Sequence, residues 1–492
     1  MRDTRLDYWV SGLVFCTALL IFVLSPLRSL GETQYTMMVA QTLLHQHTFA
    51  LDRKALQLPD QLNMIPQTAK VKDRPLEVVS GRIYKYAPPG SSLLSLPFVA
   101  IAGFLDLAPT DASGAYNPDR ELKLSAILAA FLMSTFAVVC FRTSRLLLSI
   151  SWSVVITAAA TLGTQVWSTA SRVVEPDTWS ILLMMVGLYI ILGAELRKLR
   201  LRPVLLASLL SSCYLVQPTA SISIVAITVY MVLYQWRYLR SYVVTGFAWF
   251  AAFLLYSWHN FGQVLPNYYE PSRLDFLLFR SALPGNLISP ARGVLVFVPT
   301  LLFVAFILVR YWKFTEAKRL AITAVAVLIA HVLTISGFTH WWAGHSYGPR
   351  YWTSVVPWFV VSVASCDPSE FDPATPLGTK IRIWTDQTGN VVPTTIVREQ
   401  ADCYNATQLE VDGRLFVWDP NHGVAAYDPS NLEGTFETST SVPATATDTG
   451  YRSGSRSLYI AAHGSAAYVG SGKNVQRWPH VKGDEVIRID CN

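Results

Sequence analysis

Nine long apolar runs dominate the first three quarters of the chain. They cover residues 8–26, 122–141, 148–166, 177–194, 203–218, 219–234, 242–259, 293–310 and 319–337, and a shorter tenth run covers residues 352–365. A helix needs about 20 apolar residues to cross a bilayer. Only 15% of the residues are charged, whereas soluble domains average roughly 25%. The sequence therefore predicts an all-α polytopic membrane domain over residues 1–365, with about nine to ten spans.

Lys and Arg residues cluster at the ends of these runs, and the formal net charge is +6. Cytoplasmic loops of membrane proteins carry an excess of Lys and Arg. If Arg2 and Arg5 are cytoplasmic, every later cytoplasmic end is basic, and these ends carry Arg142, Arg145, Arg197, Lys198, Arg200, Arg202, Arg237, Arg240, Lys313, Lys318 and Arg319. The basic charge therefore indicates topology, and no nucleic-acid partner is expected.

The segment between the first two runs, residues 27–121, is far too long for a simple connector. It is expected on the outer side, with a helix over residues 33–46. The apolar segment 91–107 is broken by Pro97, and counting it as a span would invert all later loops. We therefore expect this segment to be a helix that lies at the membrane interface.

The chain changes character after the tenth run. Residues 366–377 are rich in Pro, Asp and Ser, as expected of a linker. Residues 378–492 contain short β-like runs between turn residues and predict a small all-β domain. The predicted strands are residues 380–384, 414–418, 457–461, 466–469 and 486–489. If the tenth run crosses the membrane this domain is cytoplasmic; otherwise it is outside, where a Cys403–Cys491 disulfide could form.

Two acidic residues follow or open apolar runs on the predicted outer side. Glu32 comes shortly after the first run, and Asp177 opens the fourth. An acid in the first turn of a helix is stabilised by the helix dipole, which is the ordinary explanation for both. A carboxylate at the bilayer surface can also act as a general base, so both are candidate catalytic residues. The sequence predicts no metal ligands, and a divalent metal ion is allowed but not indicated.

Several cations on the outer side could bind an anion. Lys85 precedes the interfacial helix, and its ordinary explanation is a Lys that extends to the interface. Arg273, Arg280 and Arg292 lie between the seventh and eighth spans, where the positive-inside trend does not explain them. Arginine suits phosphate because its planar guanidinium donates two hydrogen bonds at once.

The densest signal is the aromatic stretch over residues 340–352. Aromatic side chains are common at membrane interfaces, but that explanation does not cover the Gly, His, Pro and Arg residues between them. Sugar rings pack on aromatic rings and need polar partners for their hydroxyls. The candidate sugar- or acceptor-binding residues of this stretch are His340, Trp341, Trp342, His345 and Tyr347.

Several short segments together resemble a known family. They are Gly31-Glu32-Thr33-Gln34-Tyr35, Lys85 with Pro88-Pro89-Gly90, Asp177, Phe261-Gly262-Gln263-Val264-Leu265-Pro266-Asn267-Tyr268-Tyr269, Ser289-Pro290-Ala291-Arg292-Gly293 and Gly344-His345-Ser346-Tyr347-Gly348-Pro349-Arg350-Tyr351. Over roughly residues 8–360, the chain resembles GT-C glycosyltransferases that use polyprenyl-phosphate sugars, near the protein mannosyltransferase and aminoarabinose transferase branch.

The resemblance implies a helical GT-C bundle and roles for individual residues. Glu32 would be the acid of the first outer loop and Asp177 a second polar anchor. Lys85 would lie near the donor phosphate, with Arg292 and Arg350 as further candidates, and Tyr268 and Tyr269 would join the sugar or acceptor site.

These expectations combine into a membrane enzyme of the cell envelope. It would sit in a bacterial inner membrane and move a sugar from a polyprenyl-phosphate donor to a hydroxyl of a glycan, lipid or protein acceptor on the outer side, with inversion. Two alternatives remain at this point. A transporter or flippase would place charges in mid-membrane, and a non-catalytic scaffold would use the tail to bind a partner. Release of labelled sugar from the donor discriminates the enzyme from both.

Overall fold

The computed structural model divides the chain into two units, Met1–Ser369 and Glu370–Asn492, which we describe separately. In the first unit it describes residues 4–25, 30, 33–57, 68–70, 74–111, 113–196, 198–269, 274–310, 312, 315, 317–344 and 348–365. In the second unit it describes residues 380–384, 407–411, 414–419, 423–427, 437–438, 457–463, 466–471, 474–479 and 485–490.

Five described helices are long and apolar enough to cross a membrane. They are α1 (Thr4–Val23), α4 (Pro118–Ser144), α6 (Pro176–Glu195), α9 (Trp236–Phe261) and α13 (Lys318–Ser336). In the most apolar stretch of each helix, 72% of the residues of α4 and of α6 are buried, against 22% in α1 and 11% in α9. The chain is therefore an integral membrane protein in which α4 and α6 form the centre and α1 and α9 present apolar side chains at the edge.

The other predicted spans coincide with shorter helices. These are α5 (Ile150–Leu162), α7 (Pro203–Val216), α8 (Ser221–Tyr234), α11 (Val294–Phe297), α12 (Thr300–Arg310) and α14 (Val356–Ala364). Short irregular helices adjoin them: η3 (Val166–Ala170), η4 (Pro218–Ala220), η5 (Asn267–Tyr269), η7 (Phe276–Leu278) and η9 (Arg350–Val355), with α10 (Phe279–Ile288) after η7. A count of nine to ten spans stays a prediction.

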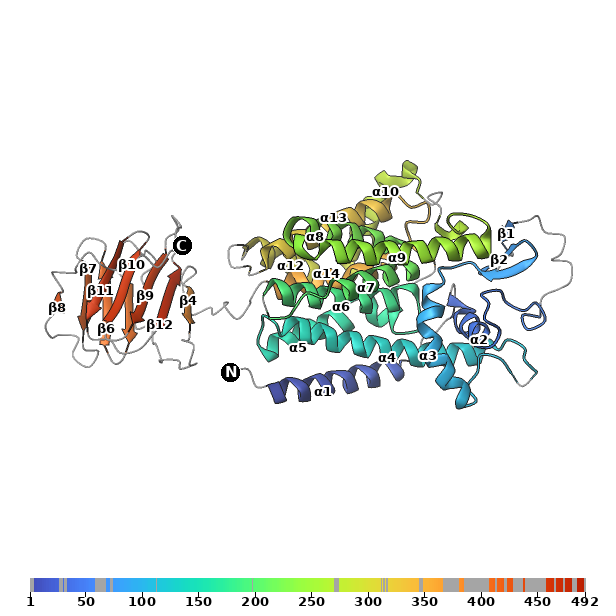
Figure 1. Ribbon diagram of the computed structural model, residues 1–492, viewed down its shortest axis with the longest axis horizontal. Helices are drawn as coiled ribbons and strands as arrows, with labels where there is room; N and C mark the ends of the chain where they lie inside the picture. Colours follow the sequence, from blue (N-terminus) through green and yellow to red (C-terminus); the bar gives the residue numbers. More distant parts are fainter. Residues whose placement is uncertain are drawn as a thin grey trace. The chain divides into compact units, whose positions relative to one another are not determined.

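The described parts of the segment between α1 and α4 lie at one end of the helical unit (Figure 1). They contain α2 (Thr36–Gln46), β1 (Thr68–Lys70), β2 (Leu76–Val79), β3 (Arg82–Lys85) and α3 (Gly90–Phe104). The three strands form an antiparallel sheet in the order β1-β2-β3. The helices lie where the sequence predicts them, whereas the sheet was not predicted. Its β2–β3 turn is Ser80-Gly81, whose φ angles of 49° and 78° suit a two-residue hairpin.

The opposite end of the helical unit carries basic residues, as the positive-inside pattern predicts. Arg145 directly follows α4, and its Nε lies 2.8 Å from Oδ1 of Asp7 in α1. The Arg142 guanidinium lies 4.9 Å from the centre of the Tyr8 ring. Asp7 and Arg145 are both buried, so this ion pair joins α1 to α4 at that end.

The described parts of the second unit are strands. They are β4 (Lys380–Trp384), β5 (Thr407–Val411), β6 (Arg414–Asp419), β7 (Gly423–Tyr427), β8 (Glu437–Thr438), β9 (Ser457–His463), β10 (Ala466–Ser471), β11 (Asn474–Pro479) and β12 (Glu485–Asp490). They form one sheet in the order β11-β10-β9-β12-β4 and another in the order β5-β6-β7-β8. An independent all-β domain stays a prediction, and both Cys403 and Cys491 lie outside the described residues.

Removal of one partner of the buried Asp7–Arg145 pair should loosen α1. A single buried charge left without its partner costs about 3 kcal/mol, so Asp7→Ala should lower the apparent melting temperature of the detergent-solubilised protein. The double variant Asp7→Ala/Arg145→Leu should recover most of that loss, because no unpaired charge remains. An unchanged melting temperature in Asp7→Ala would contradict the structural role of the pair.

Candidate functional site

The structure describes one of the two candidate catalytic acids, Asp177, and not the other, Glu32. Glu32 lies outside the described residues, as do Arg273 and the sugar-binding candidates His345 and Tyr347. Asp177 is described and buried in the first turn of α6.

Asp177 belongs to a cluster of four polar side chains, which we call the acidic cluster: Glu175, Asp177, Gln217 and Arg350. The Arg350 guanidinium donates to Oε2 of Glu175 over 2.7 Å. Its Nε lies 4.0 Å from Oδ2 of Asp177. The Gln217 amide donates to Oδ1 of Asp177 over 2.9 Å. The structure therefore brings together Asp177 and Arg350, two residues that are 173 positions apart in the numbering.

The start of α6 explains how the two acids come to lie together. Glu175 is the N-cap residue and Pro176 occupies the first helical position, a common way to begin a helix. The backbone N–H of Glu175 donates to Oγ1 of Thr178 over 3.0 Å. Asp177 then lies in the first turn, where the helix dipole favours a negative charge.

Arg350 has a different environment from the one expected of a phosphate ligand. Two carboxylates face one guanidinium, so the acidic cluster has excess negative charge when both acids are ionised. A phosphate placed at Arg350 would meet Glu175 and Asp177 at close range. Arg350 is therefore better suited to hold the two carboxylates in place than to bind the donor phosphate.

Arg292, another predicted phosphate ligand, holds the backbone segment that leads to Arg350. Its two terminal nitrogens donate to the carbonyl oxygens of Gly344 and Gly348 over 2.6 and 2.9 Å. Gly348 has a φ of 68°, which favours glycine. A Cβ at this position would lie 3.0 Å from both the Gln165 side chain and the Phe297 ring. Arg292 therefore holds Gly344 and Gly348, the latter two residues before Arg350.

Lys85 lies at the end of β3 and reaches the first turn of α2. Its ammonium donates to Oγ1 of Thr36 and interacts electrostatically with Glu121 in the first turn of α4. The two carboxylate oxygens of Glu121 accept the backbone N–H groups of Tyr35 and Met37 over 3.0 and 2.7 Å. Lys85 is therefore part of a contact between β3, α2 and α4.

Two contacts connect the Lys85 region with the acidic cluster. The hydroxyl of Ser125, one turn after Glu121 in α4, accepts the backbone N–H of Val174 over 2.8 Å. Val174 directly precedes Glu175. This hydrogen bond places the acidic cluster at the same end of the helical unit as Glu121 and Lys85.

The second contact is between helix ends. Gly90 begins α3 shortly after Lys85, and a Cβ at this position would lie 2.5 Å from the carbonyl carbon of Leu215. Leu215 is two residues before Gln217 of the acidic cluster. This close approach needs a residue without a side chain, which accounts for the glycine after Pro88-Pro89.

The predicted acceptor tyrosines lie beside the sheet of β1, β2 and β3. The Tyr268 ring contacts the Tyr86 ring at a centroid distance of 5.6 Å, and Asn267 donates to Glu77 of β2 over 3.0 Å. Burial raises the pKa of Tyr269 far above its ordinary value, so its hydroxyl stays protonated and donates to the Leu215 carbonyl over 3.2 Å. Tyr269 thus joins the segment after α9 to the end of α7.

The remaining predicted site residues are more exposed. His340 and Trp342 are exposed, and their rings lie 5.2 Å apart. Trp341 packs on Gly285 of α10, and Arg280 of the same helix is exposed. The ring contacts of His340, Trp341 and Trp342 are with one another and with α10.

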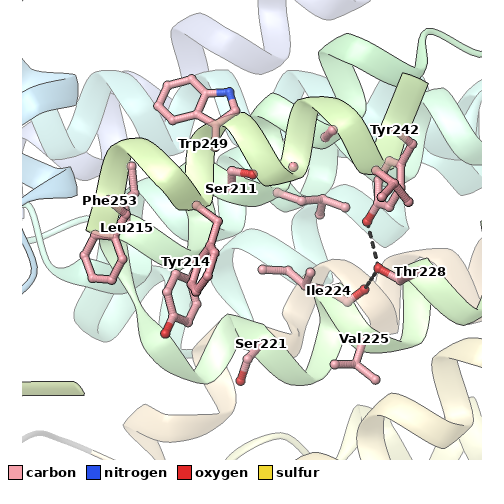
Figure 2. A pocket seen from close by; sticks show the side chains of 15 residues that line it. Ser211, Tyr214, Leu215, Ser221, Ile224, Val225, Thr228, Tyr242, Trp249 and Phe253 are labelled. Carbon is pink, nitrogen blue, oxygen red and sulfur yellow. Dashed lines mark hydrogen bonds between the residues drawn. The ribbon is translucent and has the colours of Figure 1, made fainter. Parts of the chain in front are cut away.

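A cavity of about 340 Å³ lies between α7, α8 and α9 (Figure 2). Its walls are mostly aliphatic and aromatic, and several lining residues, such as Val225 and Val243, are exposed at the apolar edge of the helical unit. Figure 2 shows Tyr214, Leu215 and Phe253 together at one end of the cavity. Because Leu215 also contacts Gly90 and Tyr269, this end of the cavity adjoins the Lys85 region.

Sequence reasoning missed Glu121 and Gln217 and left Glu175 out of the candidate catalytic residues. Glu121 lies in the first turn of a helix whose N-cap is Asn117 and whose first residue is Pro118, a recognisable helix start. Its position predicts a helix-dipole acid and not a contact with α2. Gln217 ends an apolar run without any further signal.

Among the described residues, no three His, Cys, Asp or Glu side chains come together as a group that could hold a metal ion.

Comparison with known proteins gives one structural likeness. No family model and no curated protein matches the chain. The crystal structure of ArnT from Cupriavidus metallidurans in the apo state is similar to it at 16% sequence identity and a TM-score of 0.40. The match covers 73% of this chain and 60% of that chain, so the chain spans less than two thirds of ArnT's length. A likeness of this size assigns neither a family nor an activity.

Proposed function

We propose that the protein is a GT-C-type membrane glycosyltransferase that moves a sugar from a polyprenyl-phosphate donor to an acceptor hydroxyl. The observation that carries this proposal is a juxtaposition at one end of the membrane helices. Lys85, the acidic cluster and one end of an apolar cavity lie there together. A polyprenyl-phosphate sugar has an apolar chain that suits the cavity, an anionic phosphate that suits Lys85 and a polar sugar that suits the acidic cluster.

The donor lipid would bind with its chain in the α7–α9 cavity and its phosphate near Lys85. Apolar chains gain about 0.8 kcal/mol for each buried methylene group, and the cavity opens at the apolar edge of the helical unit. An ammonium is a strong phosphate partner where water is scarce. Nucleotide sugars stay in the cytoplasm, so an enzyme that works on the outer face of a bacterial inner membrane needs such a lipid-linked donor.

The chemical step would be a direct displacement. The acceptor oxygen attacks the anomeric carbon, the bond from that carbon to the phosphate oxygen breaks, and polyprenyl phosphate leaves with the bonding electrons. The acceptor proton passes to Glu32 as general base, and the anomeric centre inverts. Lys85 stabilises the charge that grows on the phosphate, while Asp177, held by Gln217 and Arg350, orients the sugar hydroxyls.

Acceptor binding would use the exposed aromatic residues. His340 and Trp342 are exposed, and Tyr268 is half-buried beside Tyr86. Their rings offer apolar faces for sugar rings, as tryptophan and tyrosine do in many binding sites. The acceptor would be a glycan, a lipid or a protein that presents a hydroxyl group.

The direct test uses purified protein in liposomes with a polyprenyl-phosphate donor that carries a radiolabelled sugar. Wild-type protein should release the label from the lipid to an added acceptor. Glu32→Gln should abolish this release without lowering expression, because the amide cannot accept the acceptor proton. Label that crosses the liposome membrane still attached to its lipid would instead support a flippase, and full transfer by Glu32→Gln would remove Glu32 from the role of base.

A separate prediction concerns the donor chain. Gly246 of α9 lines the cavity, and a Cβ at this position would have open space around it. A leucine there should displace part of a bound chain, and loss of about two methylene contacts costs about 1.6 kcal/mol, roughly tenfold in affinity. Gly246→Leu should therefore raise KM for the donor about tenfold, with a smaller change in kcat.

Gly12→Leu is the matched control, because Gly12 is also a helical glycine with open space, on the exposed side of α1. It should leave KM unchanged. An unchanged KM in Gly246→Leu would exclude the cavity as the chain site.

A further inference from the structure

The first turn of α2 is held by a residue of another helix. Its N-cap residue, Tyr35, has a φ of 70° and no side-chain cap hydrogen bond within the helix. The first N–H groups of a helix lack partners in their own helix. Glu121 of α4 supplies partners for two N–H groups at this helix end. Its two carboxylate oxygens accept separately from the backbone N–H groups of Tyr35 and Met37. Two contacts to two residues fix both the position and the direction of this turn.

This contact is buried. Glu121 and Met37 have no exposed surface, and Tyr35 and Thr36 are each 1% exposed. A buried carboxylate is unfavourable unless hydrogen bonds and positive charge compensate it. Here the compensation comes from two backbone N–H groups, from the N-terminal ends of α2 and α4, and from the Lys85 ammonium.

Thr36 connects this anchor to Lys85. It lies between the two residues that Glu121 holds, and its hydroxyl accepts from the Lys85 ammonium. The same hydroxyl donates to the Thr33 carbonyl over 2.5 Å, and Thr33 directly follows Glu32 in the chain. Displacement of this turn would therefore reach the proposed phosphate ligand through a hydrogen bond.

We propose that Glu121 is a positioning residue of the transfer reaction, which holds the first turn of α2 so that Lys85 keeps its productive position. This inference rests on the proposed function. Glu121 does not touch substrate in this account; it acts through Thr36 and Lys85. Misplacement of reacting groups by about 1 Å costs on the order of 100-fold in rate.

A double-mutant cycle tests this role in the liposome transfer assay. Lys85→Met should lower kcat by about 10²–10³, and Glu121→Gln should lower it by about 100-fold. Because Glu121 acts through Lys85, adding Glu121→Gln to Lys85→Met should lower kcat only slightly further. A purely structural role would instead multiply the two losses, and that result, or full kcat in Glu121→Gln, would overturn the inference.

Asp119→Asn is the matched control, since Asp119 is an exposed acid in the same first turn of α4; it should keep wild-type kcat. If Glu121→Gln fails to accumulate, Thr36→Val replaces it, because valine keeps the shape of threonine but cannot accept from Lys85. The Thr36→Val loss should likewise be non-additive with Lys85→Met.

Hydrogen exchange separates this inference from the proposed function. The Tyr35 and Met37 amides should exchange faster in Glu121→Gln than in wild type, whatever reaction the protein performs. Unchanged exchange would overturn the anchoring role. A wild-type protein that transfers no sugar would refute the proposed function, while the exchange result would still decide whether Glu121 holds α2.

Discussion

Charged groups near a hydrocarbon layer must be paired, and α4 meets this constraint at both of its ends. Its 27 residues span about 40 Å at 1.5 Å each, longer than a hydrocarbon core of about 30 Å. Glu121 in the first turn is compensated by the start of α2 and by Lys85, and Arg145 after the last turn pairs with Asp7. These pairings attach α2 and β3 at one end and α1 at the other, and the proposed site depends on the first of them.

The main helices are predictable from the sequence because apolar length is a local property. Helices occur at all ten apolar runs and at the two segments expected in the outer loop. The sheet of β1, β2 and β3 is different: its strands have only three or four residues each, too few for an alternating pattern to stand out. Its core forms with α2, through residues such as Met38 and Leu76, and such contacts between distant segments leave no periodic trace.

The candidate site is predictable in its residue types and not in its pairings. An outward-facing arginine suggests an anion ligand, yet Arg350 is held by Glu175 and Asp177 and Arg292 by two glycine carbonyls. Only the spatial neighbours decide whether a guanidinium meets a carboxylate, a carbonyl or a substrate. Glu121 shows the same limit. From the sequence it is an ordinary acid in the first turn of a helix, and only the structure shows its contacts with Tyr35 and Met37.

The proposed site requires that the sheet of β1, β2 and β3 and the residues between α13 and η9 face the same side of the membrane. Single cysteines at two exposed positions, Arg82 and His340, test it in a background without native cysteines. A membrane-impermeant thiol reagent should label both in intact cells, and should label a cysteine at Arg237, at the start of α9, only after permeabilisation. Labelling of Arg82→Cys and His340→Cys from opposite sides would contradict the proposal, because no common site could then exist.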